Sequence, residues 1–302
     1  MKDGRTAVAD DVRHDSRLAR TVGDYVALTK PRLNMLVVAT SAAGYYLGAS
    51  GPLNLPHMAA AVAGTTLVAG GAAALNQVYE RDTDALMRRT RMRPLPDGRV
   101  SAFDARMFGL LLSAAGLVLL GLLVNLPATA LALTTLVVYL IVYTPMKRRS
   151  SLATLVGAVP GALPPLIGWA ASHGGLSIGG GALFLIVFLW QIPHFMAIAW
   201  LYRDDYGKAG FPMLPVVEPD GRRTGRQAVA YAVALVPASL VPAVIGLSGA
   251  VYAAFAVVLG AALLWLAIRF AATRSDRSAR WLFFSSITYL PILWIVMMAD
   301  KL

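Results

Sequence analysis

The chain has 302 residues, of which 57% are hydrophobic and 14% are charged, and its mean hydropathy is +0.62. This composition excludes a water-soluble globular fold, in which roughly 25% of residues are charged. In a soluble protein, a net charge of +11 would indicate a nucleic-acid partner. In a membrane protein, basic loops bind the anionic leaflet instead, so we expect no nucleic-acid partner. The absence of cysteine excludes disulfides and thiolate chemistry.

The N-terminal segment mixes arginine and aspartate and lacks the apolar stretch of a signal peptide. We expect a disordered cytoplasmic tail over 1–20 and a single membrane domain over 21–302. Apolar runs of about 20 residues then recur, the length that a helix needs to cross about 30 Å of hydrocarbon. They show no strand-like alternation, so the predicted fold is an all-α polytopic membrane protein. The nine predicted transmembrane helices cover residues 33–50, 57–76, 104–124, 126–143, 152–171, 178–201, 227–247, 250–270 and 281–299.

Charge alternates from loop to loop. The loops after the odd-numbered spans carry no Lys or Arg, whereas those after the even-numbered spans are basic. Of 27 Lys and Arg, only Lys301 lies outside the N-terminal segment, the even loops and the adjoining span ends. The positive-inside rule therefore places the N-terminus and the even loops in the cytoplasm, and nine spans leave the C-terminus outside. Another count would move the arginines of 88–93 across the bilayer, at roughly 2.5–3.5 kcal/mol each.

A polar stripe ends the second span. Asn76, Glu80 and Asp84 stand at i, i+4 and i+8, so on a helix they share one face and are separated by about 6 Å along the axis. Three oxygen side chains on one face suit Mg²⁺, which also binds substrate phosphate. The alternative is a solvated helix end with Glu–Arg pairs, but an amide at the end of an apolar run argues against it.

Basic residues follow this stripe and recur after the fourth span. Arg88 begins a run of arginines that ends at Pro94, and Lys147 and Arg148 come shortly after Tyr143. Guanidinium and ammonium groups bind phosphate oxygens, and they also anchor helix ends at the cytoplasmic face. Both interpretations remain open for these residues.

A second acidic cluster follows the sixth span. Asp204 and Asp205 are adjacent, so they repel each other unless a cation such as Mg²⁺, Arg203 or Lys208 lies beside them. A solvated loop is the alternative. Because both acidic clusters follow a span on the same membrane face, the pattern favours a diphosphate bound between them through shared metal ions.

His194 is the only histidine in the interior of a predicted span, because His57 is the first residue of its span and lies at the outer face. An ionisable residue within a membrane helix indicates a functional site. The alternative is a hydrogen bond to a neighbouring helix.

These motifs resemble the UbiA-type superfamily of intramembrane prenyltransferases, and within it the protohaem IX farnesyltransferase (haem O synthase) branch. The resemblance extends from about residue 25 to 298. The segments that carry it are Thr29–Arg32, Asn76–Thr90, Tyr143–Pro145, Gln191–Trp200 and Tyr202–Pro215. It implies nine helices around a central cavity in the cytoplasmic (inner) membrane, with the active site on the cytoplasmic side. In the wider superfamily the second motif has aspartates four residues apart, a spacing held here by Tyr202 and Tyr206.

The resemblance implies transfer of the farnesyl group of farnesyl diphosphate to the 2-vinyl group of haem b, with addition of water, to give haem O for haem–copper oxidases. It implies Mg²⁺ as cofactor, and as partners the lipid bilayer, both substrates and other haem-pathway enzymes such as haem A synthase. The expected catalytic residues are Asn76, Glu80, Asp84, Asp204, Asp205 and Tyr143, with Asn76, Glu80, Asp84 and Asp205 binding metal. The expected substrate-binding residues are Lys30, Arg32, Arg81, Arg88, Lys147, Arg148, Lys208, His194, Gln191 and Tyr202.

Two alternatives remain open. A sister enzyme would prenylate a quinone precursor or another aromatic ring. A secondary transporter would fit the glycines and prolines of span 152–171, which are typical of broken helices. Transporters bind substrate near the midplane, however, whereas the acidic residues here gather at one face.

Overall fold

The computed structural model describes residues 20–302, so the tail predicted over 1–20 lies almost entirely outside the described residues. The described residues form helices and no β-strand. A first helical stretch covers residues 20–28. It is followed by α2 Pro31–Gly48, α3 Leu55–Asp84, α4 Ala102–Leu123, α5 Leu126–Val137, the π-helix η1 Val138–Tyr143, α6 Thr144–Met146, α7 Ala153–His173, α8 Ile178–Leu201, α9 Arg203–Lys208, α10 Leu214–Val217, α11 Arg222–Val244, α12 Ala250–Thr273 and α13 Asp276–Ala299.

The long helices occur where the hydropathy predicts them. Within the described chain, eight are long and apolar enough to cross a membrane, with Leu126–Met146 counted as one. The remaining predicted span, α2, is not among the eight, because its first turn carries Pro31, Arg32 and Asn34. The all-helical membrane fold is confirmed, whereas nine crossings and the orientation of the termini stay predictions.

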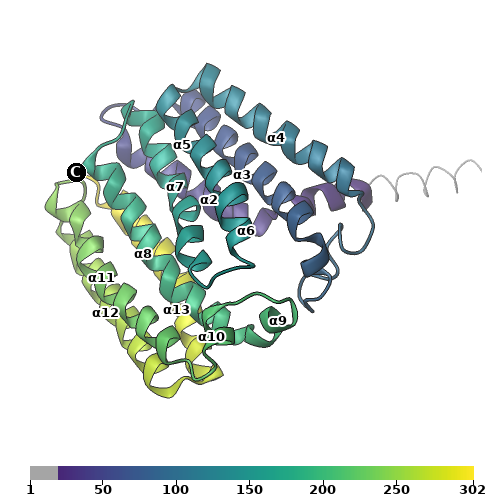
Figure 1. The fold of residues 1–302 in the computed structure, drawn as a ribbon. Helices are drawn as coiled ribbons and strands as arrows, with labels where there is room; N and C mark the ends of the chain where they lie inside the picture. Colours follow the sequence, from purple (N-terminus) through teal and green to yellow (C-terminus); the bar gives the residue numbers. More distant parts are fainter. Residues whose placement is uncertain (1–19) are drawn as a thin grey trace, which may run out of the picture.

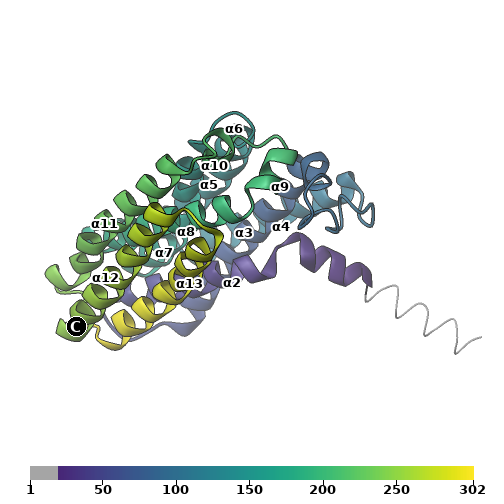
Figure 2. The same ribbon diagram turned by 90° about the horizontal axis from the view of Figure 1, so that it is seen from below.

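The helices lie side by side along a common direction (Figure 1). One side of the bundle holds α3 and α4, the other holds α11, α12 and α13, and α7 and α8 lie between them. The short helices α6, α9 and α10 gather at one end, near the loop that follows α3 (Figures 1 and 2). The loops after α3, α6 and α8 therefore meet over the same end of the bundle.

Helix α3 extends eight residues beyond the predicted end of its span, from 76 to 84. Asn76, Glu80 and Asp84 therefore lie on one continuous helix, as their spacing predicts. The helix begins at Asn54, whose side chain accepts from the His57 amide at 3.1 Å, so a cap fixes its start.

Lys301, the exception to the charge pattern, has a structural role. Its Nζ donates to the carbonyl oxygens of Tyr46 and Ala49 at 2.7 Å each, and so caps the C-terminal end of α2. The neighbouring Asp300 accepts from the Tyr252 amide at 2.7 Å, at the start of α12. The chain terminus thus ties α2, α12 and α13 together, with a cation at the negative end of a helix dipole.

Helices α2 and α7 approach each other closely because each has glycine at the contact. A Cβ at Gly44 would overlap the Pro165 carbonyl, and a Cβ at Gly168 would overlap the Ser41 carbonyl. Both clashes would be with backbone atoms, which cannot rotate away. Small residues of this kind allow membrane helices to pack backbone to backbone.

We expect Gly168→Ala to lower the Tm of the detergent-purified protein by at least about 2 °C, because overpacking costs about 1–3 kcal/mol and α2 and α7 must move apart. The matched control is Gly181→Ala in α8, where an added Cβ meets no atom within 4 Å. Thermal unfolding followed by tryptophan fluorescence measures both. Equal Tm values for the two variants would contradict the close contact.

Candidate active site

Three oxygen-bearing side chains on α3 each meet a cation from another segment. Lys30 Nζ donates to Asn76 Oδ1 at 2.9 Å, and Lys147 Nζ lies 3.0 Å from Glu80 Oε1. Arg93 donates to Asp84 Oδ2 at 2.6 Å. Asn76, Glu80 and Asp84 are 2%, 5% and 1% exposed. The solvated helix end that the sequence left open is therefore not what the structure shows.

The Asp84 carboxylate retains an unused oxygen. Its Oδ1 is buried and has no hydrogen-bond partner among residues 20–302, while Oδ2 binds Arg93. A buried carboxylate oxygen without a partner is costly, and an ion would supply the missing partner. Among residues 20–302, no three His, Cys, Asp or Glu side chains are placed to hold a metal. The residues nonetheless fit a hard cation when the Asn76 amide oxygen is counted as the third ligand beside Glu80 and Asp84.

Lys30 reaches the site from a break between two helices. It has φ 51° and ψ 61°, a left-handed conformation that a non-glycine residue seldom adopts, and Pro31 then begins α2. The break, visible in Figure 2, turns Lys30 toward α3. Burial lowers the pKa of the Lys30 ammonium to about 8, and the nearby Arg93 charge acts in the same direction.

Lys147 follows α6 and faces a carboxylate. Burial opposes its charge, but Tyr143 and Glu80 outweigh burial and raise the pKa of Lys147 above its ordinary range. Its Nζ also lies 4.8 Å from the centre of the Phe211 ring. Lys147 therefore stays an ammonium and links α3, α6 and the segment after α9.

The predicted residue Tyr143 ends the π-helix η1. Its ring stacks on Tyr139 with the centroids 5.4 Å apart, and it fills the space beside Gly157 of α7. π-Helical turns are rare and often occur at functional sites. Two aromatic rings thus lie next to the Lys147–Glu80 pair.

The second acidic cluster, Asp204 and Asp205, lies on α9. Asp204 is exposed, whereas Asp205 lines a cleft of about 460 Å³ together with Arg88, Arg91 and Lys208. The remaining residues that line this cleft are Ala85 and Leu86. Asp205 and Lys208 thus face the loop after α3. A diphosphate bound between this loop and the segment after α8 would require such an arrangement.

Tyr202 and Tyr206 bind a guanidinium group. The Arg89 Cζ lies 5.1 Å and 5.0 Å from the two ring centres, and Arg89 donates to Tyr206 Oη at 2.8 Å. Beneath this contact, Met87 packs with Tyr206 and Phe211 in an apolar cluster. The loop after α3 and the segment after α8 are therefore joined into one cap over this end of the bundle.

His194 and Gln191 lie deeper, on α8. His194 Nδ1 is 2.8 Å from Ser286 Oγ, which itself donates to the Phe283 carbonyl. Ser286 therefore accepts from Nδ1–H, and His194 Nε2 keeps its lone pair. Gln191 donates to the carbonyl oxygens of Ala158 and Val187. The hydrogen bond from His194 to a neighbouring helix, which the sequence left open, is therefore present, and its partner is Ser286 of α13.

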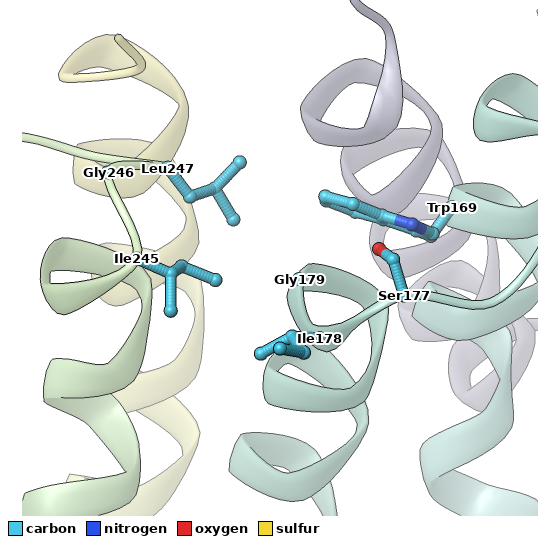
Figure 3. A pocket seen from close by; sticks show the side chains of 7 residues that line it. All are labelled: Trp169, Ser177, Ile178, Gly179, Ile245, Gly246 and Leu247. Carbon is cyan, nitrogen blue, oxygen red and sulfur yellow. The ribbon is translucent and has the colours of Figure 1, made fainter.

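A second pocket lies at the opposite end of the bundle, between the end of α7, the start of α8 and the loop after α11. It measures about 500 Å³, and Trp169 faces Ile245 and Leu247 across it (Figure 3). The residues of the described chain that line it are all uncharged. It is therefore separate from the ion pairs of α3.

Comparison with known proteins gives the family. The sequence pattern of the UbiA prenyltransferase family matches residues 37–288. The chain belongs to the UbiA prenyltransferase family. It is 47% identical over 287 residues to the "Protoheme IX farnesyltransferase" of Solibacter usitatus, covering 92% of this chain and 98% of that one. It is 46% identical to the protein of the same name from Koribacter versatilis, over 94% of this chain and 95% of that one.

Solved structures share the UbiA fold. A structure of digeranylgeranylglyceryl phosphate synthase has a TM-score of 0.79 at 16% identity and covers 93% of this chain and 98% of that one. A UbiA homologue from Archaeoglobus fulgidus, bound to GPP and Mg²⁺, has a TM-score of 0.65 at 16% identity and covers 91% and 99%. The chain is thus a multi-pass membrane protein of a prenyltransferase family.

Three arginines that the sequence predicts to bind substrate lie on the surface, away from the buried ion pairs. Arg32, Arg81 and Arg148 are exposed, and Arg81 pairs with the exposed Asp82. Their predicted substrate contacts stay predictions. The contacts also bring in four residues that the sequence did not single out: Arg89, Arg93, Tyr139 and Thr144. The two arginines had a signal as members of the basic run, and Thr144 had one as part of the segment Tyr143–Pro145, which carries the family resemblance.

We expect Lys147→Met to destabilise the protein by about 3–5 kcal/mol, because it leaves the buried Glu80 carboxylate unpaired. Adding Glu80→Gln should recover most of that loss. The control is Arg148→Met, the exposed neighbour, which should leave the Tm near that of the wild type. Thermal unfolding of the three variants decides: a Lys147→Met protein as stable as the Arg148→Met protein would show that the pair carries no stability.

Proposed function

We propose that the protein transfers the farnesyl group of farnesyl diphosphate to the 2-vinyl group of protohaem IX, with addition of water, and so makes haem O. Relatives named protohaem IX farnesyltransferase support the substrates, because they match at 46–47% identity over at least 92% of the chain. The UbiA family supports the reaction class, prenyl transfer within a membrane.

The observation that carries the proposal is the buried Asp84 Oδ1, which has no partner in the described part of the chain and lies on the same helix face as Asn76 and Glu80. It supports a metal–diphosphate site. Bound there, Mg²⁺ would neutralise the charge that builds on the diphosphate as the allylic C–O bond breaks. Asn76, Glu80 and Asp84 are the residues that would hold it. The A. fulgidus homologue bound to GPP and Mg²⁺ supports a divalent cation in this fold.

The cations that now pair with α3 would stabilise the leaving group. Lys30, Lys147 and Arg93 all lie within ion-pair distance of the stripe, so a diphosphate entering beside it would share them. Donors fixed before the reaction stabilise developing charge without reorganising. Arg88 and Lys208 line the adjoining cleft and would extend this positive surface, with Asp205 as a further metal ligand.

The allylic cation requires an environment from which water is excluded until the carbon–carbon bond has formed. Tyr143 and Tyr139 supply aromatic faces beside the site, and aromatic faces attract cations without reacting. The cap that joins Arg89 to Tyr202 and Tyr206 covers the same end. The 2-vinyl group then attacks the farnesyl cation, and water adds to the resulting porphyrin-side cation with release of a proton to solvent, which leaves the hydroxyl group.

His194 would bind the haem substrate. Its Nδ1–H is held by Ser286, so its Nε2 lone pair is the one available to iron. A bond from the second ring nitrogen to a fixed acceptor is typical of metal-binding histidines. Gln191 lies one helical turn earlier and would line the same space.

We further propose a cytoplasmic-membrane location with the site facing the cytoplasm and nine crossings, α2 included. The basic loops after α3, α6 and α8 all meet at the end of the bundle that holds the ion pairs, which supports this orientation. Contact with other haem-pathway enzymes, such as haem A synthase, stays a prediction. Membership of the UbiA family removes the transporter alternative.

Product analysis tests the substrate. Membranes containing the protein receive Mg²⁺, farnesyl diphosphate and haem b, and the pigments are separated by chromatography. We expect a new, more apolar haem with the mass of a hydroxyethylfarnesyl derivative. A prenylated quinone precursor in parallel assays, with haem b unchanged, would favour the sister reaction instead.

In the same assay, Asp84→Ala should reduce haem O formation by at least about 10²-fold, because the leaving diphosphate loses its metal ligand. Asp82→Ala is the control, since Asp82 is on the same helix but is exposed and pairs with the exposed Arg81. Size-exclusion chromatography checks that both variants fold. An active, folded Asp84→Ala protein would remove the metal assignment.

His194→Ala should weaken haem binding by at least about tenfold if its Nε2 ligates iron. His173→Ala is the control, because His173 packs at a tilt against Trp169 at the opposite end of the bundle. Difference absorption spectra of added haem report the ligand. Identical Soret bands in wild type and His194→Ala would restrict His194 to packing α8 against α13.

A further inference from the structure

The Asn76 side chain is held at both ends of its amide. Its Oδ1 accepts from Lys30 Nζ at 2.9 Å, and its Nδ2 donates to Thr144 Oγ1 at 3.2 Å. Asn76 and Thr144 are both buried, at 2% and 4% exposure. The two contacts come from two separate segments, one before α2 and one in α6, so they fix the plane and the direction of the amide.

Thr144 can only accept from Asn76, because its own proton is used elsewhere. Thr144 Oγ1 donates to the Tyr139 carbonyl at 2.8 Å, which leaves its lone pairs for the amide. If the Asn76 amide were reversed, Oδ1 would face a hydroxyl oxygen with no proton to give, and Nδ2 would face the Lys30 ammonium. The hydrogen bonds therefore permit one orientation, with Oδ1 toward the cation.

The π-helix η1 makes this arrangement possible. Its wide turn places the Tyr139 carbonyl five residues before Thr144, where it accepts both the backbone N–H and the hydroxyl of Thr144. A hydroxyl in a regular helix usually bonds to the carbonyl four residues earlier, as Thr135 does to Leu131. The π-turn thus determines where the Thr144 lone pairs point.

We propose that Thr144 is a positioning residue that fixes the Asn76 amide with its carbonyl oxygen toward the cation. In this structure that cation is the Lys30 ammonium; under the proposed function, on which this inference rests, it is the metal ion. The Glu80 carboxylate also attracts the amide hydrogens. A metal would occupy the Glu80 oxygens, however, and Thr144 would then be the acceptor that remains.

This role explains why an amide can serve beside two carboxylates. A carboxylate at 76 would need no positioning, since its two oxygens are equivalent, whereas an amide presents an oxygen on one side only. Partners that orient a metal ligand typically contribute 10–100-fold to metal affinity. Thr144 contacts neither the metal nor the substrate, and its effect passes through Asn76.

The test compares Thr144→Val, which keeps the shape and removes the acceptor, with Thr144→Ser, which keeps the hydroxyl. The control is Thr135→Val, which removes a hydroxyl-to-carbonyl bond in the same span without an amide partner. Electron paramagnetic resonance of free Mn²⁺ gives the Kd of the detergent-purified full chain, and Mg²⁺ titration of turnover gives the half-saturating concentration.

We expect Thr144→Val to raise the Mn²⁺ Kd and the half-saturating Mg²⁺ concentration by at least about tenfold. Thr144→Ser and Thr135→Val should stay within about threefold of the wild type. If Thr144→Val does not fold, Thr144→Cys replaces it, since a thiol is of similar size and a weak acceptor. A merely structural role would lower the Tm and leave the metal affinity of the folded protein unchanged.

Wild-type Mn²⁺ affinity in a folded Thr144→Val protein, or a tenfold loss in Thr144→Ser, would overturn the positioning role while leaving the proposed metal site intact. Failure of the metal site itself has a different signature. The wild type would then bind no Mn²⁺ and turn over without Mg²⁺, and the positioning role would fall with it.

Discussion

Two buried carboxylates at one end of a membrane bundle impose the constraint on which this structure depends. Glu80 and Asp84 are almost fully buried, and an unpaired buried charge costs several kcal/mol. Each carboxylate therefore requires a cation, and Lys147 and Arg93 reach them from two different segments. Together with Lys30, three cations face two carboxylates. One positive charge is left unbalanced, so the same contacts that hold the loops in place also favour an anion between them.

The bundle holds these loops at fixed distances because its helices pack closely. Glycines at 44 and 168 allow α2 and α7 to touch through their backbones, and the chain terminus caps the far end of α2. The near end of α2 carries Lys30 in a left-handed conformation, which a non-glycine residue keeps only where its surroundings impose it. Contacts at both ends of α2 and along its length therefore determine the position of the Lys30 ammonium. A shift of α2 against α7 would move this ammonium relative to Asn76.

Much of this arrangement follows from the sequence, and the part that does not has a physical reason. Hydropathy locates the long helices, and a four-residue spacing places Asn76, Glu80 and Asp84 on one face, because both depend on helix geometry alone. Which arginine pairs with Asp84 depends on how the loop after α3 folds back, and nothing in the run from 88 to 93 distinguishes Arg93. The π-helix likewise has no sequence signal, so the contact of Thr144 with Asn76 could not be predicted.

In the segment after α8, two tyrosines occupy the four-residue spacing at which the wider family has aspartates, and they bind a different partner. Tyr202 and Tyr206 stand four residues apart on one face, where two carboxylates would attract a metal ion. Two aromatic rings at that spacing instead take a planar cation, and Arg89 lies against both and donates to Tyr206 Oη. A guanidinium is covalently part of the chain, so this contact joins the loop after α3 to the segment after α8 whether or not a substrate is bound. The cap is therefore fixed close to the ion pairs before any substrate arrives, and exclusion of water begins with the fold itself.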